Sequence, residues 1–349
     1  SSLGPAIRDA ADEAGVRLVA VTSGADGRGR VAALGLRAVV AEDAPWAEFE
    51  RVLGGEEPDG VAARARRSGR IVAVWGPAGA PGRTTTAITL AAELTDAREQ
   101  VLLVDADTHG AAIAPSLGLL DEAPGFAAAC RLAGTAQLDA AQLDRVAEHY
   151  ALPSGELRVL TGIARPERWP ELSAERVATV LRLCRDEADT VVADAGSDLE
   201  GDEDDPYAPR RNAATLTVLR EADLVVAVGA ADPIGLARFL RAHAELLRQV
   251  DAETVRVVIG KVRSSAVGLA PGTQIASTLL RFGGIPDAAL VPHDPAGFDA
   301  ALLAGRTLQE SAPRSPALAA LRRFARQELL PAPAPASRTR RRWQLLPLG

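Results

Sequence analysis

A glycine-rich loop is the stretch of this sequence best suited to chemistry. It covers residues 76–82, between an apolar run at 71–75 and a helix-forming segment from Thr84 to Leu94. Glycines let backbone N–H groups approach a phosphate closely, and the start of the following helix adds partial positive charge. The pattern therefore predicts a phosphate-binding loop.

The end of this loop departs from a standard phosphate loop at one residue. Its last residues, Gly82-Arg83-Thr84-Thr85, are close to the Gly-Lys-Ser/Thr ending of a P-loop, with Arg83 in place of the phosphate-binding lysine. Arginine keeps the charge and can hold β- and γ-phosphates, but its planar fork does not reproduce a compact ammonium. Nucleotide binding is therefore a stronger prediction than brisk hydrolysis.

Aspartates at the ends of two later apolar runs complete the predicted site. Asp105 and Asp107 end one run, and two acids one residue apart at a strand end can orient a Mg²⁺-bound or attacking water. Asp194 ends the other in the pattern Val-Val-Ala-Asp-Ala-Gly, the form of a Walker B segment whose Asp holds Mg²⁺ through water. We predict Asp105 and Asp107 as catalytic residues. The predicted metal ligands are Thr84, Asp107 and Asp194.

The same glycines suit one alternative, a dinucleotide-binding unit. Gly76, Gly79 and Gly82 are evenly spaced after a strand, and Asp105 lies ~20 residues on, where a ribose-binding acid would sit. A dinucleotide, however, needs neither hydroxyls directly after the loop nor a Walker B aspartate. The combination favours a nucleoside triphosphate.

From residue 70 the sequence alternates regularly between strands and helices. Apolar runs without a polar face indicate burial on both sides, so we predict an α/β fold with a mostly parallel sheet and helices on both faces. The predicted strands are 70–75, 101–105, 157–161, 190–194, 223–228, 255–259 and 288–291. The predicted helices are 84–95, 122–133, 138–149, 173–187, 210–220, 233–249, 272–282, 296–304 and 315–329.

Segments of different composition flank this predicted domain. The predicted organisation is 1–53 receiver-like segment, 54–69 linker, 70–330 nucleotide-binding domain and 331–349 Pro/Ala spacer with a basic tail. The first segment loosely resembles the second half of a response-regulator receiver domain, with strands at 17–22 and 38–41. A generic α/β segment packed on the main domain is the alternative.

Composition and net charge limit the cellular environment and the binding partners that we expect. The chain has 349 residues, a formal net charge of −7 and two cysteines, which show no metal-ligand spacing. The acidic balance argues against DNA as a partner, and we expect a reduced, cytoplasmic environment. The arginines and Trp343 of the 338–349 tail are a candidate contact to a partner or to the inner face of the membrane, including at a cell pole.

Residues 70–330 resemble the deviant-Walker ATPases of the MinD/ParA group, and within it the CpaE/TadZ branch, which includes proteins labelled septum-site-determining. The segments that carry the resemblance are 77–85, 105–110, 194–196, 222–233, 258–263 and 290–294. It implies a SIMIBI P-loop fold that binds ATP or ADP with Mg²⁺ and forms a homodimer. The nucleotide-binding residues it implies are Gly79, Ala80, Pro81, Gly82, Arg83, Thr84, Thr85, Lys261 and Pro292.

Three residues depart from the family's pattern, and two of them weaken the expected catalysis. Ala78 aligns with the family's signature lysine, Arg83 with its Walker lysine, and Gly260 with its adenine-contacting Asn. The uncharged Ala78 removes electrostatic stabilisation from the transition state. The resemblance therefore implies a weak ATPase at most.

The resemblance also implies a role for such a switch. A CpaE/TadZ-like protein would dimerise and position Tad/Flp pilus-assembly or division machinery at the septum. Two alternatives stay open at this point. One is a pseudo-ATPase scaffold that acts without nucleotide, and the other is a ParA-like DNA-partition ATPase.

Overall fold

The chain divides into two units, Ser1–Arg67 and Ser68–Gly349. The computed structural model describes residues 20–22, 39–41, 69–79, 81–119, 124–201 and 210–330. Within the first unit, strands β1 (Ala20–Thr22) and β2 (Val39–Ala41) pair in parallel, inside the two strands predicted there.

Other predicted parts of the chain lie outside the described residues. They are the helices of the receiver-like segment, the linker up to residue 68, and the spacer with its basic tail. The receiver-like segment and the tail contact therefore stay predictions.

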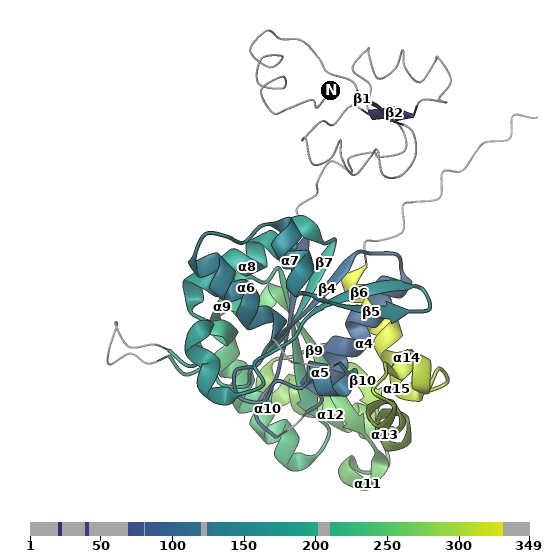
Figure 1. Ribbon diagram of the computed structural model, residues 1–349. Helices are drawn as coiled ribbons and strands as arrows, with labels where there is room; N and C mark the ends of the chain where they lie inside the picture. Colours follow the sequence, from purple (N-terminus) through teal and green to yellow (C-terminus); the bar gives the residue numbers. More distant parts are fainter. Residues whose placement is uncertain are drawn as a thin grey trace, which may run out of the picture. The chain divides into compact units, whose positions relative to one another are not determined.

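The second unit is built on an eight-stranded sheet (Figure 1). The strands are β3 (Arg70–Trp75), β4 (Val101–Ala106), β5 (Glu148–Leu152), β6 (Gly155–Leu160), β7 (Thr190–Ala195), β8 (Leu224–Ala230), β9 (Val255–Val262) and β10 (Ala289–Pro292). Their order across the sheet is β10-β9-β8-β3-β7-β4-β6-β5. All neighbours are parallel except β5 and β6. The predicted mostly parallel α/β fold is confirmed.

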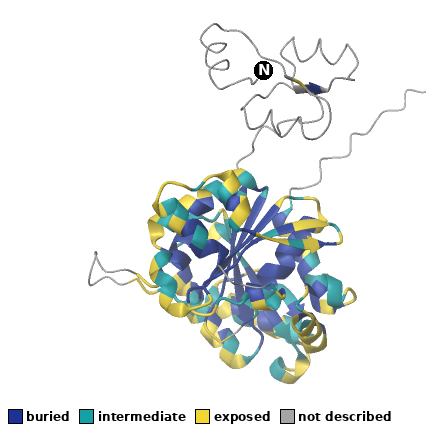
Figure 2. Cartoon of the chain, viewed as in Figure 1, coloured by how far each residue is buried: buried dark blue, intermediate teal, exposed yellow. Residues whose placement is uncertain are grey.

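Helices cover both faces of the sheet, and the central strands β3, β4, β7 and β8 are buried along almost their whole length (Figure 2). The α-helices are α4 (Arg83–Asp96), α5 (Ile113–Ser116), α6 (Gly125–Gly134), α7 (Ala140–Val146), α8 (Ala174–Glu187), α9 (Ala213–Glu221), α10 (Pro233–Leu246), α11 (Ser264–Val267), α12 (Pro271–Gly283), α13 (Pro295–Ala304), α14 (Leu308–Ser311) and α15 (Pro316–Phe324). Shorter helical turns are Pro166–Glu171, Ala252–Thr254 and Ala325–Leu329.

Strand β3 shows how the three layers are held together. Its side chains alternate between two separate cores because successive residues of a strand point to opposite faces. Ile71, Ala73 and Trp75 enter the core shared with α6, α8 and α10, whereas Val72 and Val74 enter the core shared with α4 and α15. Full burial of each large apolar side chain stabilises the fold by about 1.5–3 kcal/mol. The central strand is therefore fixed from both sides before the loop begins.

The predicted helix 138–149 is wrong in its last part. Helix α7 ends at Val146, and the chain continues as the edge strand β5, in which Leu152 is paired with Gly155 of β6. The two residues between them form a tight hairpin turn, and Pro153 disfavours helical backbone at the residue before it. Pairing with β6 therefore outweighs the helix propensity of this segment.

An ion pair fastens the C-terminal helix to the helix that follows the glycine-rich loop. Glu93 of α4 is buried, and Arg322 of α15 donates from Nε and Nη2 to its two carboxylate oxygens at 2.7 and 2.9 Å. The Gln309 side chain also donates to Glu93. The C-terminal end of α4 is thus held by residues more than two hundred positions later in the chain.

We predict that Glu93→Ala lowers the free energy of unfolding by about 1–3 kcal/mol, because Arg322 and Gln309 lose their shared acceptor. Urea unfolding followed by circular dichroism measures this change. The control is Arg323→Ala, an exposed neighbour on the same helix, which should stay within about 0.5 kcal/mol of the parent chain. Equal effects of the two variants would contradict the role of the pair.

Candidate functional site

Strand register brings the predicted acidic residues to one edge of the sheet. In the parallel pairing of β4 with β7, Asp105 lies opposite Asp194, and in the pairing of β3 with β7, Val74 lies opposite Asp194. These three residues form a row at the carboxyl ends of the central strands. The glycine-rich loop leaves β3 at the same edge, where ligands of parallel sheets bind.

The loop depends on glycine at its start and at its end. A Cβ on Gly76 would lie 2.3 Å from the carbonyl oxygen of Val228, so only glycine lets the loop pass β8 this closely. Gly82 has a φ of 98°, and its carbonyl oxygen accepts the first hydrogen bond of α4, from Thr86 N–H at 2.9 Å. This positive φ turns the chain directly into the helix. Ala80, one of the predicted phosphate contacts, lies outside the described residues.

Arg83 points back under the loop and forms a largely buried ion pair. Its Nη2 donates to Oδ2 of Asp107 at 2.9 Å, and its Nη1 donates to the carbonyl oxygen of Gly76 at 3.2 Å. The side chains of Arg83 and Asp107 are 15% and 6% exposed. The residue in the lysine position is therefore held by one of the predicted catalytic acids.

Thr84 and Asp194 form a second pair beside the first. Thr84 Oγ1 donates to Oδ2 of Asp194 at 2.6 Å, while the other carboxylate oxygen, Oδ1, is buried with no hydrogen-bond partner. Buried polar atoms are nearly always satisfied, so an orphaned carboxylate oxygen indicates a missing partner. Mg²⁺ is typically held by one or two carboxylates together with substrate phosphates. These two residues therefore fit the predicted metal site.

Asp105 and Asp107 use their oxygens differently. Asp105 accepts from the backbone N–H groups of Asp107, Ala112 and Ile113 at 3.2, 3.0 and 3.0 Å. Asp107 accepts from His109 N–H at 2.9 Å on Oδ1 and keeps Oδ2 for Arg83. Asp105 thus fixes the segment after β4, whereas Asp107 faces the loop.

Burial makes this edge unfavourable for negative charge. It raises the pKa of Asp105 and that of Asp194 well above the ordinary range, since both carboxyl groups lie in the interior. The negative charge of Asp105 raises the pKa of Asp194 further, and Thr84 and Arg83 offset only part of the effect. Additional positive charge would therefore stabilise the site.

The remaining predicted residues are Thr85 and Lys261, which lie at the loop, and Pro292, which lies in the edge strand β10. Thr85 Oγ1 donates to the carbonyl oxygen of Gly82 at 3.0 Å. Lys261, in β9, has a φ of 58° and lines a small hollow together with Gly79 and Pro81 of the loop. Pro292 ends β10, opposite Val262 of β9.

Arg238, which lies on α10 beside the loop, was not among the predicted site residues. Its Nη1 is 2.6 Å from the position that a Cβ on Gly79 would occupy. In the sequence it is one of several arginines on a predicted helix, a pattern typical of a solvated face. Only the adjacency of β8 and β3 places this helix next to the loop.

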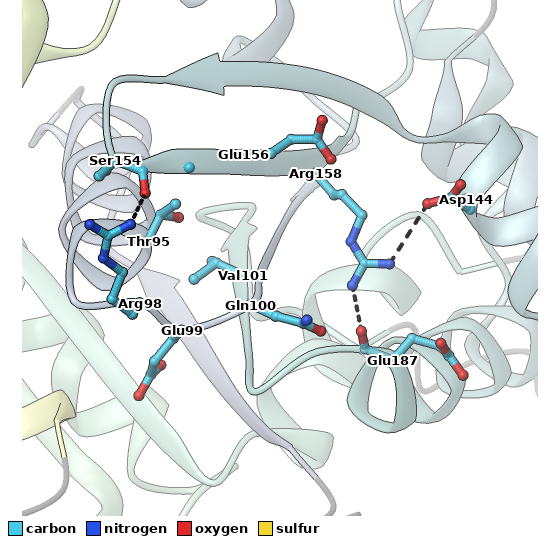
Figure 3. A pocket seen from close by; sticks show the side chains of 11 residues that line it. Thr95, Arg98, Glu99, Gln100, Val101, Asp144, Ser154, Glu156, Arg158 and Glu187 are labelled. Atoms are coloured by element: carbon cyan, nitrogen blue, oxygen red, sulfur yellow. Dashed lines mark hydrogen bonds and ion pairs between the residues drawn. The ribbon is translucent and has the colours of Figure 1, made fainter. Parts of the chain in front are cut away.

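Another pocket, of about 470 Å³, lies at the opposite edge of the sheet, where β4, β6 and β7 begin (Figure 3). Its arginines are engaged within the chain: Arg98 donates to the carbonyl oxygen of Ser154 and Arg158 to that of Glu187. None of the predicted site residues lines it. This pocket is therefore separate from the predicted site at the carboxyl edge.

Comparison with known proteins identifies the family. The model of the CobQ/CobB/MinD/ParA nucleotide binding domain matches residues 72–296, more than half of the chain. The chain belongs to this family. The match begins after the predicted receiver-like segment, and nothing in the comparisons singles out the CpaE/TadZ branch. No curated protein matches the chain.

Solved structures of MinD/ParA proteins share the fold. A ParA family ATPase from Chlorobium tepidum TLS is 18% identical, with a TM-score of 0.61, and the match covers 73% of this chain and 98% of that one. The septum site-determining protein MinD from Pyrococcus horikoshii OT3, complexed with Mg-ADP, is 17% identical with a TM-score of 0.57, covering 74% and 94%. In the described part of this chain, no helix has the length and apolar character needed to cross a membrane.

The raised pKa values predict how stability depends on pH. A carboxyl whose pKa is higher in the folded than in the unfolded state contributes stability at acid pH, and this contribution is lost as pH rises through the folded-state pKa. Without Mg²⁺ or nucleotide, we therefore predict that Asp194→Asn is more stable relative to the parent chain at about pH 8 than at about pH 5. The expected difference exceeds about 1.4 kcal/mol, the equivalent of one pKa unit.

Urea unfolding in EDTA at the two pH values measures this difference. Asp287→Asn, a change at an exposed carboxylate, is the control and should show no such pH dependence. Parallel behaviour of Asp194→Asn and the parent chain would contradict the assignment of an uncompensated buried charge to Asp194.

Proposed function

We propose that the 76–82 loop binds ATP or ADP with Mg²⁺ and that the chain works as a slow, nucleotide-gated switch. The convergence of two hydrogen-bonded pairs at the loop carries this proposal. Arg83 is paired with Asp107, and Thr84 is paired with Asp194. Each pair joins the start of α4 to the end of a different strand, so a ligand in the loop acts on both strands at once.

Phosphate binding would rearrange the first pair. The backbone N–H groups at the start of α4 and the Arg83 guanidinium are the groups suited to phosphate oxygens. Arg83 cannot serve the phosphates fully while one of its nitrogens is bonded to Asp107. Phosphate oxygens therefore compete with Asp107, and the segment that follows β4 changes its contacts when nucleotide binds.

Thr84 and Asp194 would hold the Mg²⁺, whose positive charge stabilises the negative charge on the phosphates. Asp107, once released from Arg83, faces the loop with a free carboxylate oxygen and can orient an attacking water. Asp105 acts as a positioning residue because its oxygens bind the backbone of the same segment.

Slow turnover follows from the residues at two positions. Arg83 presents a planar fork in place of a compact ammonium, and Ala78 contributes no charge. In addition, Asp107 is held in an ion pair with Arg83. We therefore propose that nucleotide occupancy, more than the rate of hydrolysis, sets the state of the switch.

The partners of the switch are proposed by analogy with relatives. A MinD of Aquifex aeolicus, 16% identical with a TM-score of 0.54, has been solved as a MinC:MinD complex covering 76% of this chain and 99% of that one. By analogy we propose a nucleotide-dependent homodimer that recruits a second protein. Positioning of pilus-assembly or septum machinery, as in the CpaE/TadZ branch, rests on the sequence resemblance alone.

We predict that Arg83→Ala weakens binding of Mg·ADP by about ten- to a hundredfold, the loss expected when a charge-assisted hydrogen bond to phosphate is removed. Arg83→Lys, which keeps the charge, should stay within about tenfold of the parent chain. Isothermal titration calorimetry measures both.

Arg98→Ala at the opposite edge of the sheet is the control and should bind like the parent chain. Absence of any nucleotide binding by the parent chain would refute the proposed switch and favour a nucleotide-independent scaffold. Unchanged binding by Arg83→Ala would refute the role of Arg83.

A further inference from the structure

A second arginine is positioned to reach the phosphate loop from the neighbouring helix. Helix α10 begins at Pro233, directly after Asp232, whose Oδ1 accepts from the N–H groups of Ile234 and Gly235 at 3.1 and 2.9 Å. This cap fixes the direction in which the helix leaves β8. Arg238 lies about one turn further on, against the loop.

The contact between Arg238 and the loop is close and is made at a glycine. Arg238 Nη1 lies 2.6 Å from the position of a Cβ on Gly79, and Gly79 has a φ of 108°. Any side chain at Gly79 would collide with the guanidinium and strain the backbone. The absence of a side chain at this position therefore lets the guanidinium reach the loop.

Arg238 also lines two hollows beside the loop. The larger, of about 610 Å³, and the smaller, of about 80 Å³, share Pro77, Ala78, Gly79 and Arg238. Lys261 adds a second cationic side chain to the smaller one. A ligand extending from the loop toward α10 would meet Arg238 whichever hollow it entered.

The guanidinium of Arg238 has its hydrogen-bonding groups available. The side chain is exposed, and no ion pair or hydrogen bond joins it to another described residue. By contrast, Arg83 is bonded to Asp107 and Arg241 donates to the carbonyl oxygen of Ala237 in its own helix. Arginine suits this use because its fork can donate two parallel hydrogen bonds to phosphate oxygens.

Charge balance indicates what this arginine would bind. The carboxyl edge holds Asp105, Asp107 and Asp194 with Arg83 as the cation bonded among them. A polyphosphate brings several more negative charges to the mouth of the loop. We propose that Arg238 is a second phosphate-binding residue, which holds the polyphosphate chain of the nucleotide in the loop of its own chain. This proposal deepens the proposed function and rests on it.

Calorimetric titrations with Mg·ATP, and with tripolyphosphate in place of nucleotide, test the proposal. Arg238→Ala should weaken the binding of both ligands about tenfold, the loss expected for one charge-assisted contact to phosphate. Arg238→Lys should lose less affinity, because lysine keeps the positive charge although it lacks the planar guanidinium. The matched control is Arg248→Ala, an exposed arginine just beyond the end of α10, which should bind both ligands within about twofold of the parent chain. A melting curve for each variant establishes that it is folded.

A second variant tests the contact from the side of the loop. Gly79→Ala displaces the guanidinium and should weaken tripolyphosphate binding in the parent chain. In an Arg238→Ala background the same change should have a smaller effect, since the collision no longer exists. Additive effects of the two changes would count against the contact.

The outcomes separate this proposal from the proposed function. If the parent chain binds Mg·ATP and Arg238→Ala binds it equally well, the role of Arg238 is refuted and the switch stands. If the parent chain binds tripolyphosphate through Arg238 but not Mg·ATP, the nucleotide switch is refuted and the phosphate site stands. If it binds neither ligand, both are refuted.

Discussion

An imbalance of buried charge at the carboxyl ends of the central strands governs this site. The parallel register places Asp105 beside Asp194, and the segment after β4 adds Asp107, while Arg83 is the cation bonded among them. Burial raises the pKa of Asp105 and of Asp194 because ionised carboxylates are unfavourable in the interior. The site is therefore arranged to gain stability from a cation such as Mg²⁺.

The same imbalance explains why one ion pair can act as a switch. Arg83 is the ion-pair partner of Asp107 and, in the function that we propose, also binds phosphate. It cannot fully satisfy both, so ligand binding is coupled to the contacts of Asp107. A lysine at this position would couple phosphate binding to the contacts of Asp107 less directly. Its ammonium is a compact point charge and lacks the planar fork with which a guanidinium can face two partners at once. We propose that arginine at position 83, while slowing hydrolysis, supports gating.

Local sequence signals predicted much of this architecture, and contacts between distant elements account for what was missed. The continuous apolar run of β3, the glycines after it and the aspartates at strand ends each carry a local pattern, so the loop and its acids were predictable. Strand β5 was missed because its pairing with β6 decides its structure. Arg238 was missed because its position beside Gly79 follows from the order of strands, which spacing along the chain does not encode.

The most direct test of this account is the distance between Arg83 Nη2 and Asp107 Oδ2 in a crystal structure of the chain with Mg·ADP. This distance is 2.9 Å in the structure described above. We predict that it increases beyond hydrogen-bonding range while the guanidinium contacts phosphate oxygens. An intact pair beside bound phosphates would contradict the claim that nucleotide gates the chain through Arg83.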